Sequence, residues 1–326
     1  MIRKIIDRQP TNLLPRCPSL NLPAQTCRAL LPIYLKLAGV AMIWGGTFVA
    51  GRLLAGQVSP LLLASLRFLL ASLALLLFMM LARVPLVWPS PRQWGRLLWL
   101  SGFGIFVYNL CFFHGLDLIG ASRAALIVAL NPAMIGLASW LLFKERLAPL
   151  KVLGIACAVA GAGVVIASGN HAIAVEGEST WRGDLLILGC VLSWSLYSLY
   201  SRPLTQALGA LPTVAYSIGL GTAMLWLATL IQGEVDIAVI AALDTRQWLA
   251  LGYLGVLGSA LAYIWYYQGI AQVGPTQAGV FIARNPLTAV LLGALLLDER
   301  LTLGMGAGGL LILAGLYLCN RPVVNR

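Results

Sequence analysis

The sequence is short of charge, and above all of acidic residues. Only 10% of its 326 residues are charged, with 11 Asp and Glu against 22 Lys and Arg, whereas soluble proteins carry about a quarter charged residues. Instead, 60% of the residues are hydrophobic, and apolar runs long enough to cross a bilayer as helices recur along the chain. The scarcity of charge leaves no room for a soluble domain and predicts an all-α membrane protein that crosses the bilayer many times.

The motifs of several other protein classes are also missing. The six cysteines are scattered without a CxxC pair, which argues against a disulfide framework and a metal site. The chain has no GxxxxGK[ST] loop for ATP and no HExxH or GxSxG motif. We therefore expect no cofactor, no bound metal and no enzymatic activity. A membrane-embedded enzyme is the rival class. A sensor or scaffold is the third, although it would normally carry a soluble output domain.

Ten apolar segments are long enough to span the membrane. We predict helices at about residues 34–54, 60–81, 97–117, 121–143, 150–168, 184–203, 211–232, 248–270, 276–297 and 302–320. Residues 1–32 are basic and lack the continuous apolar core of a signal peptide. They are predicted to form a disordered cytoplasmic tail. An amphipathic surface segment and a start codon assigned too early are the alternatives.

Basic residues are distributed unevenly between the two sides of this ten-span arrangement. The side that holds both chain ends receives 15 of them and the opposite side five, while Arg67 and Arg284 fall within spans. Because Lys and Arg concentrate in cytoplasmic loops, both termini are predicted to be cytoplasmic, with the protein in the cell's inner membrane. The basic excess is then a topology signal and a contact for anionic lipids, and no nucleic-acid partner is expected.

One segment of the chain occurs twice. Residues 120–163 align without a gap with residues 274–317 at a constant offset of 154, which places Asn131-Pro132 on Asn285-Pro286 and Glu145-Arg146 on Glu299-Arg300. Nearer the start of each half the offset is 150, and Trp44 matches Trp194. The predicted repeats are residues 33–168 and 182–320. Because each holds five helices, an odd number, the two lie in opposite orientations, as in transporters that bind substrate near the membrane midplane.

Together these features resemble the EamA-type members of the drug/metabolite transporter superfamily. The resemblance rests on the N-P…E-R-L…G…G pattern that closes each half, on W-G-G-T-F at residues 44–48 and on L-R-F at residues 66–68. It implies a central cavity lined by the first four helices of each half, with the fifth and tenth helices at the periphery. It also implies export of amino acids and related metabolites, with drug efflux in some members.

The fifth and tenth predicted helices are rich in glycine. Gly304 and Gly308 form a GxxxG motif in the tenth, and small residues at such spacing allow helices to pack closely in a membrane. We expect this face to pack within the fold. Homodimerisation through it is the alternative.

Two arginines inside predicted spans are the first candidates for substrate binding. Arg67 lies in the second span and Arg284 in the ninth, and no Asp or Glu falls near the middle of any span. An unpaired charge at the bilayer centre costs about 2.5–3.5 kcal/mol on insertion scales. We expect at least one arginine to face the cavity and bind an anionic group such as a substrate carboxylate. Snorkelling, or bonding to helix-end carbonyls, is the alternative.

Aromatic and polar residues at helical spacing are the second group of candidates. Tyr263 and Tyr267 share one face of the eighth span, and pairs at i, i+3 in the first span recur in the sixth. Such faces could line a cavity for a small amphipathic solute, or they could serve helix packing or an interfacial aromatic belt. The cavity candidates, with both arginines, are Trp44, Thr47, Arg67, Asn109, Trp194, Tyr197, Tyr263, Tyr267 and Arg284.

The two Asn-Pro pairs fall in the middle of predicted spans. Proline breaks the local helical hydrogen bond and frees a carbonyl, which neighbouring side chains can satisfy in a membrane. Asn131, Pro132, Asn285 and Pro286 are therefore predicted to form a hinge or kink that supports alternating access, with a static bend as the alternative.

The sequence as a whole predicts a secondary transporter that exports amino acids or related small metabolites by alternating access. Multidrug efflux and metabolite uptake by the same fold are the alternatives. The expected partners are the lipid bilayer and a small-molecule substrate, with the protein a monomer or homodimer. Facilitated diffusion, exchange and proton antiport all stay open, because no carboxylate near the midplane indicates a proton relay.

Overall fold

A computed structural model describes residues 24–84, 87–143, 149–168, 180–273, 278, 281, 284–299 and 301–319. In this part of the chain all regular secondary structure is helical, which confirms the all-α prediction. The first half contains α1 (Ala24–Leu54), α2 (Pro60–Leu81), α3 (Pro91–Ser101), the π-helix η1 (Gly102–Val107), α4 (Tyr108–Leu118), α5 (Ala121–Val128), α6 (Asn131–Phe143) and α7 (Pro149–Ala167). The second half contains α8 (Thr180–Leu208), α9 (Ala210–Ile231), α10 (Ile237–Ala242), α11 (Thr245–Gly252), the π-helix η2 (Tyr253–Leu261), α12 (Ala262–Val273), α14 (Asn285–Leu296) and α15 (Leu303–Cys319).

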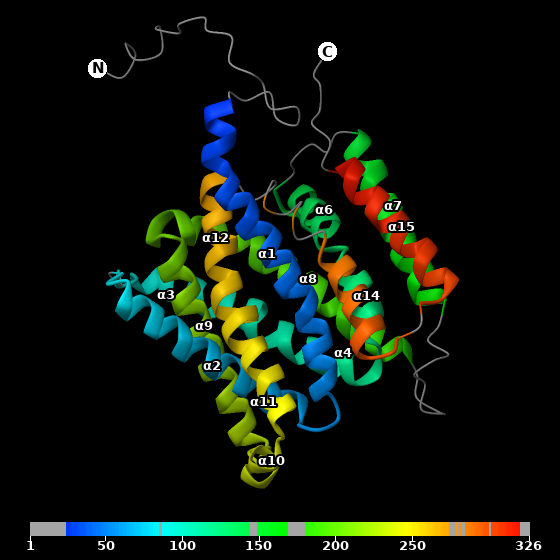
Figure 1. Cartoon of the computed structure of the whole chain (residues 1–326). Helices are drawn as coiled ribbons and strands as arrows, with labels where there is room; N and C mark the ends of the chain where they lie inside the picture. Colours follow the sequence, from blue (N-terminus) through cyan, green and yellow to red (C-terminus); the bar gives the residue numbers. More distant parts are fainter. Residues whose placement is uncertain are drawn as a thin grey trace, which may run out of the picture.

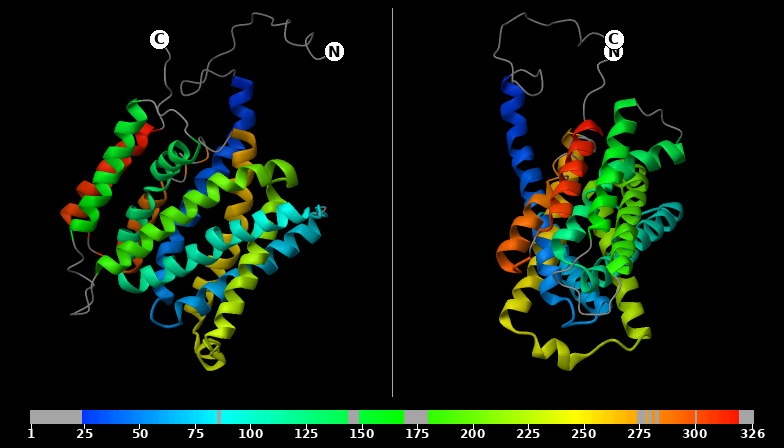
Figure 2. Two further views of the ribbon diagram at one scale, coloured as in Figure 1. Left: turned by 180° about the vertical axis from the view of Figure 1, so that it is seen from behind. Right: turned by 90° about the vertical axis from the view of Figure 1, so that its right-hand side faces the viewer.

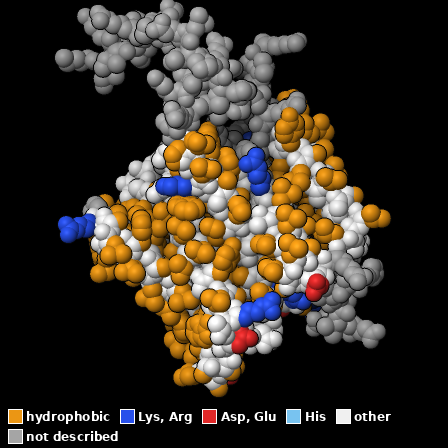
Figure 3. Space-filling view, viewed as in Figure 1, with side chains coloured by type: hydrophobic (Ala, Val, Ile, Leu, Met, Phe, Trp, Pro, Cys, Tyr) orange, Lys and Arg blue, Asp and Glu red, His pale blue; other side chains and the backbone are white. Residues whose placement is uncertain are grey.

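Eight helical segments among the described residues are long and apolar enough to cross a membrane. They match the first eight predicted spans, with α3, η1 and α4 forming one continuous segment, Pro91–Leu118, and α11, η2 and α12 most of another. Two shorter apolar helices, Asn285–Leu296 and Leu303–Cys319, lie in the ninth and tenth predicted spans. The face seen in Figure 3 is accordingly mainly apolar, with few charged side chains. The chain is therefore a multi-pass membrane protein.

The first helix starts earlier than the composition suggests. The sequence predicts a tail up to residue 32, whereas α1 begins at Ala24 and includes Pro32. A helix can extend beyond its apolar stretch, because its hydrogen bonds do not depend on apolar side chains. Residues 1–23 lie outside the described residues.

Both Asn-Pro pairs stand at the start of a helix. α5 ends at Val128 and α6 begins at Asn131, and between them the Leu130 amide donates to the Ile127 carbonyl three residues back, at 3.0 Å. α14 likewise begins at Asn285. Because proline has no N–H with which to continue a preceding helix, the chain is interrupted where the sequence places its kink. Hinge motion at these positions stays a prediction.

Two π-helical segments interrupt the third and eighth spans, and each brings a glycine against the first helix of the other half. A Cβ on Gly104 in η1 would lie 2.0 Å from Cδ2 of Tyr197 in α8. A Cβ on Gly258 in η2 would lie 2.6 Å from Cγ2 of Thr47 in α1. The spacing of the sequence does not predict these segments. π-helical turns are rare and frequently occur at functional sites.

The glycine-rich helices α7 and α15 pack against each other at the edge of the bundle, as both views in Figure 2 and the view in Figure 1 show. A Cβ on Gly161 would lie 2.7 Å from the Gly308 carbonyl oxygen, and a Cβ on Gly154 2.6 Å from that of Gly315. Only glycine allows the two backbones to approach so closely. The prediction that this face packs within the fold is confirmed, and homodimerisation stays a prediction of the sequence.

Candidate functional site

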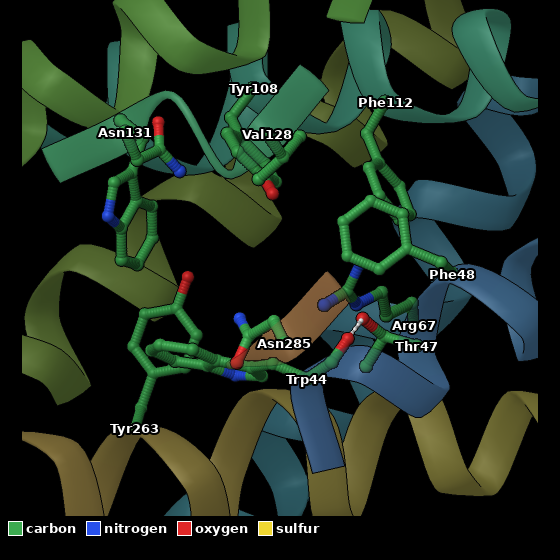
Figure 4. Close-up of a pocket in the computed structure, with 11 residues that line it drawn as sticks. Trp44, Thr47, Phe48, Arg67, Tyr108, Phe112, Val128, Asn131, Tyr263 and Asn285 are labelled. Atoms are coloured by element: carbon green, nitrogen blue, oxygen red, sulfur yellow. Dashed lines mark hydrogen bonds between the residues drawn. The ribbon is translucent and has the colours of Figure 1, made fainter. Parts of the chain in front are cut away.

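A small cavity lies among helices of both halves near the middle of the bundle. Its volume is about 40 Å³, which is room for a few waters, since one water needs roughly 10–15 Å³. Figure 4 shows side chains from several helices directed into it. The lining residues are Trp44, Thr47, Phe48, Arg67, Tyr108, Phe112, Val128, Asn131, Trp194, Tyr263 and Asn285.

Arg67 is the charged side chain of this cavity. It projects from α2, is 5% exposed, and is held from two sides. Its Nε donates to Ser259 Oγ of η2 at 2.9 Å, and one terminal nitrogen donates to Asn109 Oδ1 of α4 at 3.2 Å. Both partners are themselves anchored, because Ser259 donates to the Leu254 carbonyl and Asn109 to that of Ile105. The guanidinium is therefore fixed in orientation before any ligand binds.

No carboxylate neutralises Arg67 within the described part of the chain. The ion pair found there joins two other residues, Arg123 and Asp184. The Arg67 guanidinium instead lies 5.2 Å from the ring centre of Phe68 and 5.8 Å from that of Phe112. Contacts between a cation and an aromatic face contribute about 0.5–2 kcal/mol, less than a full charge partner at such a buried position. The cavity thus contains a positive charge that an anionic ligand could neutralise.

The wall of the cavity away from Arg67 is aromatic. Trp44 makes edge contacts with Trp194 and Tyr263, each with ring centres 5.6 Å apart. Its indole Nε1 donates to the Gly258 carbonyl of η2 at 2.9 Å, which ties the wall to the same π-helix that supplies Ser259. Such edge-to-face contacts hold large rings in a defined arrangement.

The two Asn-Pro motifs converge on this cavity. Asn131 is the first residue of α6 and Asn285 the first of α14, and both line the space while being 6% exposed. Pro132 and Pro286 follow them on the helices and are not among the lining residues. The breaks in both helices therefore place amide side chains beside the cavity.

The structure brings most of the predicted cavity candidates together. Trp44, Thr47, Arg67, Trp194 and Tyr263 line the cavity. Three more are buried outside the lining: Asn109 binds Arg67, the Tyr197 hydroxyl lies 3.3 Å from that of Ser217, and Tyr267 packs on Tyr266.

Arg284, the second arginine predicted as a candidate for substrate binding, is not among the residues that line this cavity. Its side chain is exposed, with the guanidinium 5.1 Å from the ring centre of Phe281. Successive residues of a helix point about 100° apart, so when Asn285 faces the cavity its predecessor points elsewhere. The matching residue of the first repeat, Leu130, is buried at 3% exposure.

Sequence reasoning did not find several residues of the site. Phe48, Tyr108 and Val128 line the cavity, and Ser259 orients Arg67. Tyr108 and Phe112 are four residues apart, a spacing that places both on one face. Ser259 carries no such signal, because its position depends on the π-helical register of η2.

In the described part of the chain, eight membrane-length helices and a cavity lined by aromatic side chains, two asparagines and one arginine are features expected of a membrane transport protein. The sequence profile of the EamA-like transporter family matches residues 31–167 and again residues 181–321. The uncharacterized inner membrane transporter YedA of Escherichia coli (strain K12) is 30% identical over 279 residues, covering 84% of this chain and 86% of that protein. An uncharacterized transporter of Archaeoglobus fulgidus is 27% identical, covering 87% and 96%. The chain belongs to the EamA-like transporter family.

Two further comparisons agree with this assignment. The uncharacterized transporter YyaM of Bacillus subtilis (strain 168) is 26% identical over 262 residues, covering 80% of this chain and 85% of that protein. A protein of known crystal structure superposes with a TM-score of 0.65 at 23% identity, covering 88% of this chain and 95% of that one. At that identity the superposition supports the fold alone.

Proposed function

We propose that the protein is a secondary transporter that exports small carboxylate-bearing metabolites, such as amino acids, across the inner membrane by alternating access. The observation that carries this proposal is Arg67, a buried cation that lines the cavity and has no carboxylate partner among the described residues. An arginine fork matches a carboxylate in shape and charge. Binding of a substrate carboxylate would supply the missing countercharge.

The small size of the cavity supports alternating access. Ligand pockets usually measure about 300–1,000 Å³, whereas this one is about 40 Å³. A metabolite therefore enters only if the helices around the cavity move apart. The interrupted helices at Asn131 and Asn285 are the proposed hinges, because both breaks adjoin the cavity.

Pairs of equivalent contacts support two inverted repeats and ten spans. The contact between Gly104 and Tyr197 corresponds, at the offsets of 154 and 150, to that between Gly258 and Thr47. The contact between Gly115 and Ile187 corresponds in the same way to that between Gly269 and Leu37. Each contact joins the third span of one half to the first of the other, as a pseudo-twofold arrangement requires. We place both termini in the cytoplasm. In Figure 1, the start of α1 and the end of α15 lie at the same end of the molecule.

Multidrug efflux is the second candidate function. The wall formed by Trp44, Trp194 and Tyr263 would accept an apolar ring or a cationic drug by stacking. Drug efflux does not require an anion to bind at Arg67. The counterflow experiment described next therefore distinguishes the two candidate functions.

Counterflow in liposomes over a panel of amino acids, their amides and cationic drugs tests the proposal. We expect uptake of carboxylate-bearing compounds by the unmodified protein and its loss in Arg67→Gln. Arg246→Gln, which changes an exposed arginine, is the control for charge and expression. Counterflow of drugs but of no carboxylate, or unchanged counterflow by Arg67→Gln, would overturn the proposal.

A further inference from the structure

A buried ion pair outside the cavity lining ties the two halves together. Arg123 of α5 and Asp184 of α8 form a two-pronged contact, with Nε 2.8 Å from Oδ1 and Nη2 2.7 Å from Oδ2. The side chains are only 1% and 4% exposed. Nη2 also donates to the Ile166 carbonyl near the end of α7 at 2.8 Å. Two parallel hydrogen bonds between charged groups are among the strongest polar contacts in proteins.

The two residues before Arg123 are also bound to the second half. Glu299, between α14 and α15, accepts the backbone N–H of Ala121 at 2.7 Å and that of Ser122 at 2.9 Å. A carboxylate at the first turn of a helix satisfies free N–H groups and interacts favourably with the helix dipole. Three consecutive residues at the start of α5 are thus attached to the other half. We call Ala121, Ser122, Arg123, Asp184 and Glu299 the α5 clamp.

The α5 clamp lies at the end of the molecule opposite to the chain termini. Arg52, in the last turn of α1, donates to the carbonyls of Leu116 and Asp117 just before α5 begins. Arg123 precedes the cavity-lining Val128 by five residues of α5, or about 7.5 Å along the helix. Beside the clamp the halves are in close contact, because a Cβ on Gly183 would lie 2.7 Å from Ile119 Cγ2 and 2.9 Å from Leu118 Cβ. The halves are therefore held together by ionic contacts and by close packing at this end of the molecule.

The ion pair of the clamp has no counterpart in the sequence at the other end of the molecule. The repeat offsets place Tyr34 opposite Asp184 and Gln277 opposite Arg123, so the ion pair is replaced by two uncharged residues. They place Pro275 opposite Ala121, and proline has no N–H for a carboxylate to accept. The packing contacts of Gly115 with Ile187 and of Gly269 with Leu37 occur one at each end, whereas among the described residues the ion pair is found at one end only.

We propose that the α5 clamp is a one-sided lock on the transport cycle. It holds the cavity closed at the end away from the termini, so the protein at rest opens on the side of the termini. Transport requires the clamp to separate once per cycle. This proposal rests on the proposed alternating access. It adds which side of the membrane the cavity faces in the resting protein and which residues determine that preference.

Site-directed labelling tests this lock without any substrate. The reporter is Val128→Cys in the cavity, in a chain whose six native cysteines are replaced by alanine, labelled by a membrane-impermeant maleimide in vesicles of either orientation. With the clamp unmodified, we expect the cysteine at position 128 to be labelled almost only from the side of the termini. Because loss of one partner leaves an uncompensated buried charge, the test variant is the double exchange Arg123→Gln with Asp184→Asn. It should raise labelling from the opposite side about tenfold.

Two further variants complete the test. The charge exchange Arg123→Asp with Asp184→Arg should return labelling from the opposite side toward the original rate. Arg52→Gln breaks polar contacts at the same end but within the first half, and should leave labelling unchanged. Equal labelling from both sides before mutation, or no change in the double variant, would overturn the lock. Counterflow is measured in parallel on vesicles that hold the same clamp variants with Val128 unchanged. A labelling shift without counterflow refutes the transport proposal alone, and counterflow without a labelling shift refutes the lock alone.

Discussion

At the scale of single residues, the Arg67 guanidinium is held in a fixed orientation without a negatively charged partner among the described residues. Ser259 and Asn109 fix two nitrogens of the guanidinium from different halves of the chain. Neither residue supplies a negative charge, so the positive charge of Arg67 stays uncompensated. A carboxylate in place of Ser259 or Asn109 would neutralise the guanidinium within the protein, and an anionic ligand would then bind less tightly.

We predict that Ser259→Ala weakens substrate binding more than it slows turnover. A hydrogen bond to a charged group contributes about 1.5–3 kcal/mol, so the half-saturation concentration should rise by about tenfold or more. Concentration-dependent counterflow measures this constant separately from the maximal rate. Ser259→Thr keeps the hydroxyl and should restore most of the affinity.

A control for this experiment is Ser101→Ala. Ser101 is also buried, but its hydroxyl donates to the carbonyl of Leu97, four residues back in its own helix. Its loss should change the half-saturation concentration little. If both alanine variants behave alike, Ser259 does not position Arg67 for binding.

At the scale of elements, the π-helices η1 and η2 connect the packing of the halves to the cavity. Gly104 and Gly258 let α8 and α1 approach these segments closely. The carbonyl of Gly258 holds Trp44, and the neighbouring Ser259 holds Arg67. A change in the register of η2 would therefore move both the aromatic wall and the charge.

We predict that Gly104→Ala destabilises the protein, whereas Gly102→Ala in the same π-helix does not. The new Cβ would lie 2.0 Å from Tyr197 Cδ2 in the first variant and would meet nothing within 4 Å in the second. Overpacking of this kind costs about 1–3 kcal/mol. Thermal unfolding in detergent should show a lower midpoint for Gly104→Ala only. Equal midpoints would show that the contact with Tyr197 relaxes freely.

At the scale of the whole molecule, the proposed topology explains where the basic residues lie. Because each half has an odd number of spans, the second half is inverted relative to the first. The total is then even, so both termini lie on one side of the membrane, and the α5 clamp lies at the opposite end of the molecule. The distribution of Lys and Arg then predicts that the terminal side faces the cytoplasm.

We predict that a fluorescent protein fused after Arg326 fluoresces, because green fluorescent protein folds in the cytoplasm but not after export through the bacterial secretion channel. Alkaline phosphatase at the same position should stay inactive, because it needs the oxidising periplasm for its disulfides. Fusions truncated after Gln57, between α1 and α2, should give the opposite results. Phosphatase activity at the C-terminus would overturn the predicted orientation.

The sequence predicts the features that depend on local or additive properties. Apolar length fixes the helices, and proline fixes the breaks at Pro132 and Pro286 because it lacks an N–H. Arg67 is predicted as a site residue from its charge alone, since charged residues within a span are rare and usually functional. The same argument applies to Arg284, but its side chain lies outside the cavity lining. The direction in which a side chain points depends on where its helix begins, which the charge does not reveal.

The sequence by itself therefore determined the class, the family and the duplicated pattern of this protein, because hydropathy, proline and repeat offsets act along the chain. Only the tertiary structure decided which side chains share the cavity, that Ser259 of a π-helix orients Arg67, and that Arg123 meets Asp184 across the two halves. These contacts join residues 61 to 192 positions apart. Their geometry follows from helix rotation and close packing, which no property read along the sequence specifies.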